Sequence, residues 1–347
     1  MISRSILLVA FGAFLLLLAL SILEYVIRTQ LRASRSGISR VGLTDIDPVY
    51  EDDLNNLMTL SEERTPGPRY WQEKRLTFRS KSINLVDGFR VTTDMPPVRA
   101  KTIHMYGGST TLCIEVPDDK TISSYLQREI RIAGRPYSVF NRGVSGATVH
   151  GNLNYLVQDE ICSGDIVIVY FGINDAKVTS YPRCGRGLFS VLPLWVPLIH
   201  AVKKFTRLML LEWLWYQTVT LDVVKLEKFA AKRSRLAEEC MSEIRSRVEM
   251  SGASLIAVLQ PHIWSKRQTS REKSRASQVD RNIPKVLEVT YKKFLSDFSK
   301  VSGFYTFVEV FNHVNNDTYV DWSHTNGVGN EILAKHFMSI IIESTSA

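Results

Sequence analysis

The sequence predicts a three-layer α/β/α domain with a five-stranded parallel sheet, preceded by an N-terminal transmembrane helix. Short apolar segments alternate with segments of helical period from residue 101 onward, which is the order of a parallel sheet covered by helices on both faces. Residues 165–171 (DIVIVYF) form a nearly continuous apolar run, typical of a strand that is buried on both faces. Residues 6–23 carry no charged side chain and lie at the extreme N-terminus.

The uncharged N-terminal segment is long enough to cross about 30 Å of hydrocarbon as a helix. We expect residues 1–35 to form a single-pass membrane anchor and its flank. A cleaved signal peptide is the alternative, because Arg4 fits an n-region, but the apolar stretch is long and no clean small-x-small site follows it. We place the body of the chain outside the cytoplasm. The orientation stays open, since the four arginines that follow the span favour the other side: Arg28, Arg32, Arg35 and Arg40.

The formal net charge of +8 on 347 residues is concentrated in two segments. Residues 1–35 carry four arginines against one glutamate, and residues 264–285 carry seven basic against two acidic side chains, so the remainder is neutral in sum. The second segment either attracts an acidic polysaccharide or anionic lipid headgroups, or is a solvated loop and helix start. No aromatic platform or binding motif accompanies it, so we expect no nucleic-acid partner. With 22% charged and 10% aromatic residues, the composition excludes disorder, collagen and coiled coil.

The predicted domain covers residues 101–347 and follows a loop-rich lead-in over residues 36–100, in which prolines and glycine mark turns. Its strands are expected at residues 102–106, 137–140, 165–171, 253–259 and 305–310. Its helices are expected at residues 121–133, 149–161, 221–250, 284–299 and 327–343. Ligands of such a sheet bind at the carboxyl ends of the strands.

An insertion at about residues 176–220 interrupts this alternation with apolar residues, prolines, Lys203-Lys204 and several aromatic side chains. We favour a cap over the substrate cleft; a helix in the membrane interface and a partner interface are the alternatives. The four cysteines are buried thiols or disulfide partners in one of three pairings. Because the chain has no C-x-x-C and no metal-ligand spacing, we expect no metal and no other cofactor. The cysteines are Cys113, Cys162, Cys184 and Cys240.

Four polar clusters follow predicted strands or precede the last helix. They are residues 107–110 (GGST), 141–146 (NRGVSG), 172–175 (GIND) and 321–324 (DWSH). The first three close successive strands and therefore meet at one edge of a parallel sheet, to which the last helix can return the fourth. An acyl-transfer site needs a nucleophile, a base, a carboxylate that orients the base, and oxyanion donors. The clusters supply all four.

In this order the clusters resemble the motifs of the SGNH (GDSL-type) hydrolases over about residues 101–343. The resemblance implies a flavodoxin-like three-layer fold and a Ser-His-Asp mechanism without a cofactor. Ser109 would be the nucleophile, His324 the general base and Asp321 its partner. The backbone N–H groups of Ser109 and Gly146 and the side-chain amide of Asn174 would hold the oxyanion.

Two positions depart from the family pattern, because Gly108 and Thr110 stand where the family has Asp and Leu. Neither side chain performs a catalytic step, so the departure indicates a divergent subgroup. Membrane-anchored chains with the GGST variant look like hydrolases found with bacterial surface-polysaccharide machinery. The resemblance thus implies an esterase that removes acyl groups, most simply O-acetyl groups, from a glycan.

Two other functions remain open for the same fold: an O-acyltransferase with the same triad, and a catalytically silent scaffold. Gln260 and His262 follow the fourth predicted strand and are candidate substrate contacts, whereas Asp175 is expected to be structural. The oligomeric state is left open.

Overall fold

The computed structural model describes residues 48–62, 75–96, 101–176, 183–184, 220–277 and 279–346. The predicted anchor at residues 1–35 and nearly all of the insertion at 176–220 lie outside these ranges. Within them, no helix combines the length and apolar character needed to cross a membrane. The chain divides into two compact units, one of them made of Gly42–Tyr181 and Val224–Ala347. In the other unit, the short strands β6 (Arg183–Cys184) and β7 (Thr220–Leu221) form an antiparallel pair.

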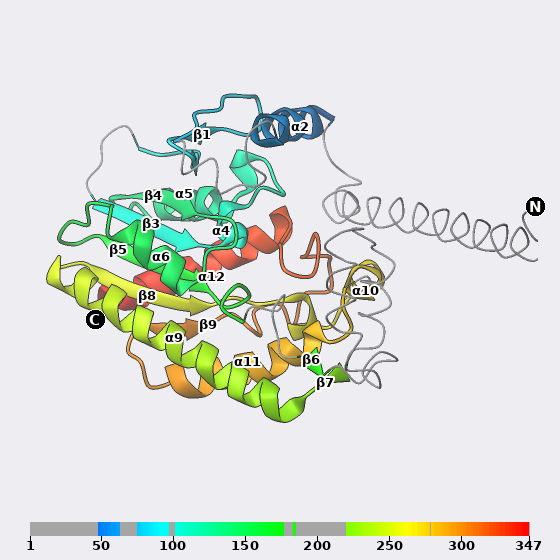
Figure 1. Cartoon of the computed structure of the whole chain (residues 1–347). Coiled ribbons are helices and arrows are strands. Elements are labelled where there is room, and N and C mark those ends of the chain that lie inside the picture. Colours follow the sequence, from blue (N-terminus) through cyan, green and yellow to red (C-terminus); the bar gives the residue numbers. More distant parts are fainter. Residues whose placement is uncertain are drawn as a thin grey trace, which may run out of the picture. The chain divides into compact units, whose positions relative to one another are not determined.

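The larger unit is built on a five-stranded sheet in the order β4-β3-β5-β8-β9, and all neighbouring strands are parallel (Figure 1). Numbered along the chain, this is the 2-1-3-4-5 order of flavodoxin-like sheets. The predicted five-stranded parallel sheet is therefore confirmed. The strands are β3 (Lys101–Gly107), β4 (Tyr137–Gly143), β5 (Ile166–Phe171), β8 (Ser254–Leu259) and β9 (Phe304–Thr306).

Helices cover both faces of this sheet, because alternate side chains of each strand point to opposite sides. On one face, Met105 and Ile168 pack in a single core with residues of α5 (Ile122–Ile132) and α12 (Gly327–Ser346). On the other face, the Phe171 ring contacts Phe294 and Phe298 of α11 (Ile283–Phe298). Helices α6 (Val149–Leu156) and α9 (Val223–Met250) lie on that same side (Figure 1).

The ends of several elements differ from the sequence prediction. Strand β9 ends at Thr306, because the Phe307 N–H still bonds to the Leu259 carbonyl but Val310 N–H then turns back to the Phe307 carbonyl. Helix α6 ends at Leu156, five residues before the expected end at 161. Strand β4 extends to Gly143 and so includes the polar residues expected to follow it.

The segment predicted as a loop-rich lead-in contains helix α2 (Pro48–Glu62) and the hairpin of β1 (Leu85–Val86) and β2 (Phe89–Arg90). Side chains from both parts form a second small core, which includes Tyr50, Ile83 and Leu112. Leu112 belongs to α4 (Ser109–Leu112), the short helix that follows β3. Helix α2 and the hairpin therefore belong to the same packed unit as the sheet and support the turn after β3.

Arg90 connects the lead-in to the chain that follows α4. Its fully buried guanidinium forms an ion pair with Asp118 and donates to the carbonyls of Cys113 (3.1 Å) and Val116 (2.7 Å). A buried charge is tolerated only when it is paired and its donors are satisfied, as they are here. Arg90 thus fixes the backbone of residues 113–118 relative to the hairpin.

A second buried ion pair lies in the basic segment at 264–285. Lys266 and Glu272, whose side chains are both 0% exposed, approach to 3.0 Å. Lys266 also donates to the Asn316 carbonyl (2.9 Å), and Glu272 accepts the Thr318 N–H (2.9 Å). A solvated loop is therefore the wrong interpretation for Lys266, because this residue ties α10 (Ser270–Ser277) to the loop before residue 321.

Replacing Lys266 by Met leaves the Glu272 carboxylate buried without its counter-charge. We expect K266M to lower the free energy of unfolding by about 3–5 kcal/mol, because an unpaired buried charge keeps its desolvation cost. Urea unfolding at neutral pH measures the change.

The double variant K266M/E272L removes both charges and should recover much of that loss. The matched surface control is R235M, which breaks an exposed 2.9 Å pair with Glu239. It should change the free energy of unfolding by less than about 1 kcal/mol. Equal losses in K266M and R235M would contradict the assignment.

Candidate active site

The turn from β3 into α4 presents Ser109 at the carboxyl end of the first strand. Ser109 is the first residue of α4, and the Gly108 carbonyl accepts the N–H groups of Thr111 and Leu112, both at 3.1 Å. The turn is packed too closely to admit a side chain at Gly107 or Gly108. A Cβ on Gly107 would lie under 3.0 Å from the Tyr170 carbonyl oxygen. The glycine at this position is therefore a steric requirement.

The segment with the sequence DWSH forms a tight turn closed by a β-bridge between Tyr319 and Thr325. Within it, Asp321 Oδ1 accepts the backbone N–H groups of Ser323 and His324, both at 2.7 Å. These two bonds fix Oδ1 against the backbone of the turn, and they leave Oδ2 facing the imidazole. The three-residue spacing of Asp321 and His324 therefore places the carboxylate and the imidazole side by side.

Ser109, His324 and Asp321 form one hydrogen-bonded series across 215 residues of sequence. His324 Nε2 lies 2.8 Å from Ser109 Oγ, and His324 Nδ1 lies 2.7 Å from Asp321 Oδ2. With Nδ1–H donating to the carboxylate, Nε2 can accept the hydroxyl proton of Ser109. This is the geometry needed for a serine nucleophile activated by an oriented base.

The charges around the imidazole favour its protonated form. Burial alone lowers the pKa of His324, but the carboxylates of Asp321 and Glu115 outweigh that effect and raise it to about 10. Burial also raises the pKa of Asp321, yet the His324 charge and the hydrogen bonds from His324 and Ser323 hold it below its usual value. The Asp321 carboxylate is therefore ionised and available to stabilise an imidazolium.

Glu115 is a site residue that the sequence analysis missed. Its Oε1 lies 3.6 Å from His324 Nε2, the nitrogen that faces Ser109. Burial raises the pKa of Glu115 above its usual value, and the His324 charge opposes that rise only in part. No motif carries Glu115, so only the geometry of the loop after α4 reveals it.

Asn174 and Gly146, the two predicted oxyanion donors beyond Ser109, border the nucleophile turn. Asn174 Nδ2 donates to the Ala147 carbonyl at 3.0 Å, and Gly146 precedes Ala147 in a turn where it adopts a φ of +73°. A Cβ on Gly108 would lie under 3.0 Å from Asn174 Nδ2. The glycine at position 108 therefore gives room for the Asn174 amide beside the nucleophile turn.

Asp175 has a structural environment, as expected. Its buried carboxylate accepts the N–H groups of Val149 (2.8 Å) and Gly172 (3.1 Å), and its own carbonyl accepts Arg233 Nε. Burial raises the pKa of Asp175 to about 6 against these hydrogen bonds. Asp175 thus links the start of α6 to the end of β5 and fixes the loop that carries Asn174.

Gln260 and His262 lie after β8 and are both buried, at 3% and 7% exposed. Gln260 accepts the Thr110 hydroxyl at 3.3 Å, which places it directly behind the nucleophile turn. His262 packs edge-on against the Tyr291 ring, and burial lowers its pKa to about 4, so it is neutral. Their role as substrate contacts stays a prediction.

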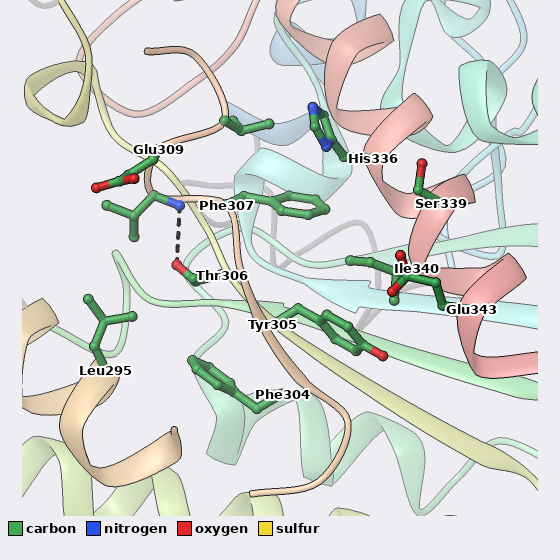
Figure 2. A pocket seen from close by; sticks show the side chains of 12 residues that line it. Leu295, Phe304, Tyr305, Thr306, Phe307, Glu309, His336, Ser339, Ile340 and Glu343 are labelled. Atoms are coloured by element: carbon green, nitrogen blue, oxygen red, sulfur yellow. Dashed lines mark hydrogen bonds between the residues drawn. The ribbon is translucent and has the colours of Figure 1, made fainter. Parts of the chain in front are cut away.

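A cavity of about 680 Å³ lies along strand β9 and helix α12 (Figure 2). None of the predicted site residues lines it. Its walls include Phe304, Phe307, His336 and Glu343. Among the described residues, no group of three or more histidine, cysteine, aspartate or glutamate side chains is arranged to hold a metal ion.

No protein-family model matches the chain, and no curated protein matches its sequence. Solved structures similar to it include a lipolytic protein of the G-D-S-L family from Veillonella parvula (13% identity, 69% of this chain, 97% of that one, TM-score 0.38). Another is a psychrotrophic esterase from Pseudoalteromonas (12% identity, 72% and 100% covered, TM-score 0.37). A third is an acetyl xylan esterase from Geobacillus stearothermophilus (16% identity, 70% and 95% covered, TM-score 0.35). At these values, function is inferred from the chain's own site.

The glycine at the end of β4 provides a test of how the nucleophile turn is held. A Cβ on Gly143 would lie under 3.0 Å from backbone atoms of Thr111 and Leu112, which cannot move aside as a flexible side chain can. We expect G143A to lower the free energy of unfolding by about 1–3 kcal/mol through overpacking. Denaturant unfolding measures this.

The control is G151A, at a glycine within α6 where the new Cβ would lie 3.4 Å from its nearest neighbour, the Ala147 side chain. The free energy of unfolding of G151A should be unchanged or up to about 1 kcal/mol higher. A neutral G143A would contradict the packing argument.

Proposed function

We propose that the chain is a serine ester hydrolase of the SGNH type. The observation that carries the proposal is the single hydrogen-bonded series from Ser109 through His324 to Asp321. Each member has the chemistry that its position requires: a hydroxyl at the sheet edge, an imidazole with one nitrogen facing it, and a carboxylate, 14% exposed, on the other nitrogen. The predicted oxyanion donors border the same turn.

The proposed reaction proceeds in two proton-coupled stages. Neutral His324 accepts the Ser109 proton at Nε2 as Oγ attacks the ester carbonyl carbon. The developing oxyanion is stabilised by the Asn174 amide and the backbone N–H groups of Gly146 and Ser109. The imidazolium, paired with Asp321, then protonates the leaving alcohol oxygen as its bond to carbon breaks. Water then attacks the acyl-enzyme carbonyl as His324 accepts its proton at Nε2. The imidazolium returns that proton to Ser109 Oγ as the bond from Oγ to the acyl carbon breaks, which releases the acid, free Ser109 and neutral His324.

For the substrate we propose an O-acetyl ester on a glycan. The GGST motif and the N-terminal apolar segment support this, because chains that combine these two features resemble hydrolases found with surface-polysaccharide machinery. In the basic segment, Arg267, Arg271 and Lys273 are exposed and would attract an acidic polysaccharide. We further propose that residues 1–35 anchor the chain in a membrane, with the domain outside the cytoplasm.

Removal of the Ser109 hydroxyl tests the proposed function. We expect S109A to lose on the order of 10⁴-fold or more in kcat, because the nucleophile is absent and no acyl-enzyme forms. Acetate release from acetylated glycans and from p-nitrophenyl acetate measures it, alongside labelling by a fluorophosphonate probe. The control S246A changes an exposed serine on α9 and should retain wild-type rates.

Two outcomes would contradict the proposal: full activity in S109A, or a folded wild-type protein that neither releases acetate nor reacts with the probe at Ser109. Product analysis in the presence of an acceptor glycan separates hydrolysis from acyl transfer.

Truncation of Asn174 tests the oxyanion assignment separately. We expect N174A to lower kcat by roughly 10²–10³-fold with little change in KM, because the amide is needed most when the carbonyl oxygen becomes charged. Steady-state kinetics on p-nitrophenyl acetate measures both constants. Asn154, which is exposed on α6, provides the control variant N154A. If N174A raised KM and left kcat unchanged, the amide would act in substrate binding.

A further inference from the structure

The imidazole of His324 lies between two carboxylates, although the proposed mechanism uses only one. Asp321 approaches Nδ1 at 2.7 Å, and Glu115 approaches Nε2 at 3.6 Å. Nε2 is also the nitrogen that lies 2.8 Å from Ser109 Oγ. Glu115 therefore faces the same proton position that the base must empty before it can activate Ser109.

The position of Glu115 is fixed by the backbone around it. Cys113, two residues earlier, adopts the left-handed conformation with a φ of +54°, which turns the chain sharply out of α4. Arg90 then binds the carbonyls of Cys113 and Val116 on either side of Glu115. The Glu115 side chain is 13% exposed, so only a narrow face of it meets solvent. The lead-in hairpin thus holds a nearly buried carboxylate beside the base.

We propose that Glu115 is a positioning residue that retains a proton on Nε2 of His324 in the free enzyme and so sets the pH at which Ser109 is activated. The consequence for catalysis rests on the proposed esterase function; the effect on the imidazole does not. The same charge stabilises the imidazolium that forms during acyl transfer, so Glu115 acts on both the ground state and the transition state.

The electrostatic surroundings agree with this role. The charged groups acting on His324 are Asp321 and Glu115, and together they raise its pKa despite burial. Glu115 in turn faces His324, Asp321 and the Arg90 guanidinium. The nearby Cys113 thiol and Tyr50 hydroxyl have pKa values raised by burial, so both are neutral through the range in which an esterase works. Because the members interact closely, the midpoint observed belongs to the group as a whole.

The direction of the pH effect follows from the form of the base that reacts. Only neutral imidazole can accept the Ser109 proton, so activity rises with pH through the midpoint of His324. The variant E115Q removes a negative charge 3.6 Å from Nε2 and should lower that midpoint by roughly one pH unit or more. Below the wild-type midpoint, E115Q should then be up to roughly tenfold faster than wild type. Above it, E115Q should be slower, because the imidazolium in the transition state has lost one stabilising charge.

The test is the pH dependence of kcat/KM for p-nitrophenyl acetate, an ester whose leaving group has no hydroxyl or ammonium group to bind Glu115. Wild type, E115Q and E115A are compared with E238Q, which neutralises an exposed glutamate on α9. We expect the acid limb to move to lower pH in both Glu115 variants and the pH–rate curves to cross that of wild type. Damage to folding would lower activity at every pH and produce no crossing.

A second measurement does not depend on activity. NMR titration of the His324 ring, identified by comparison with H324Q, gives its midpoint in wild type and E115Q. A lower midpoint in E115Q supports the inference even if no ester is hydrolysed, in which case the proposed function alone fails. An unchanged midpoint in an active, Ser109-dependent enzyme overturns the inference and leaves the proposed function standing.

Discussion

The close approach of backbone to backbone where β3 enters α4 is the constraint on which the site depends. Gly107, Gly108 and Gly143 lie where a Cβ would come under 3.0 Å from neighbouring atoms. Without side chains at these positions, the ends of three neighbouring strands converge on Ser109, and the Asn174 amide fits beside it. The positions of the polar groups therefore depend on backbone packing: the space that these three glycines leave free allows Ser109 and the Asn174 amide to lie close together.

The base reaches this packed turn from the far end of the chain, and it needs independent support. The loop at 316–318 is held by the fully buried pair of Lys266 and Glu272, and the following turn holds Asp321 through its own backbone N–H groups. In the ion pair and in the turn alike, each charged group has fixed partners, and this restricts the position of the imidazole. A base that reaches its nucleophile across 215 residues of sequence can be placed to within a hydrogen bond only by such over-determined loops.

The sheet and the central site residues were predictable because each depends on a local pattern. Residues 166–171 and 255–259 are uninterrupted apolar segments. Ser109 and Asn174 directly follow predicted strands, and the D-x-x-H turn precedes the last helix. Glu115 was not predictable, because its place depends on the left-handed Cys113 and on a guanidinium contributed by Arg90, twenty-five residues earlier in the sequence. Lys266 was counted with a basic segment, since sequence shows its charge but not its burial. The need for glycine at position 108 is equally hidden in the sequence, because the approach of Asn174 is a tertiary contact.

Under the proposed mechanism, the negative charges around His324 have two opposing effects. A carboxylate near the imidazole stabilises the cation that forms in the transition state, but it also favours that cation before the reaction begins. In that mechanism, Asp321 contacts Nδ1, away from the transferred proton, and mainly fixes the orientation and tautomer of the imidazole. A charge at Nε2 is different, because it acts on the nitrogen that must be empty at the start and occupied in the transition state. In this chain, the lead-in hairpin holds Glu115 beside that nitrogen, so a segment outside the sheet bears on the protonation of the base.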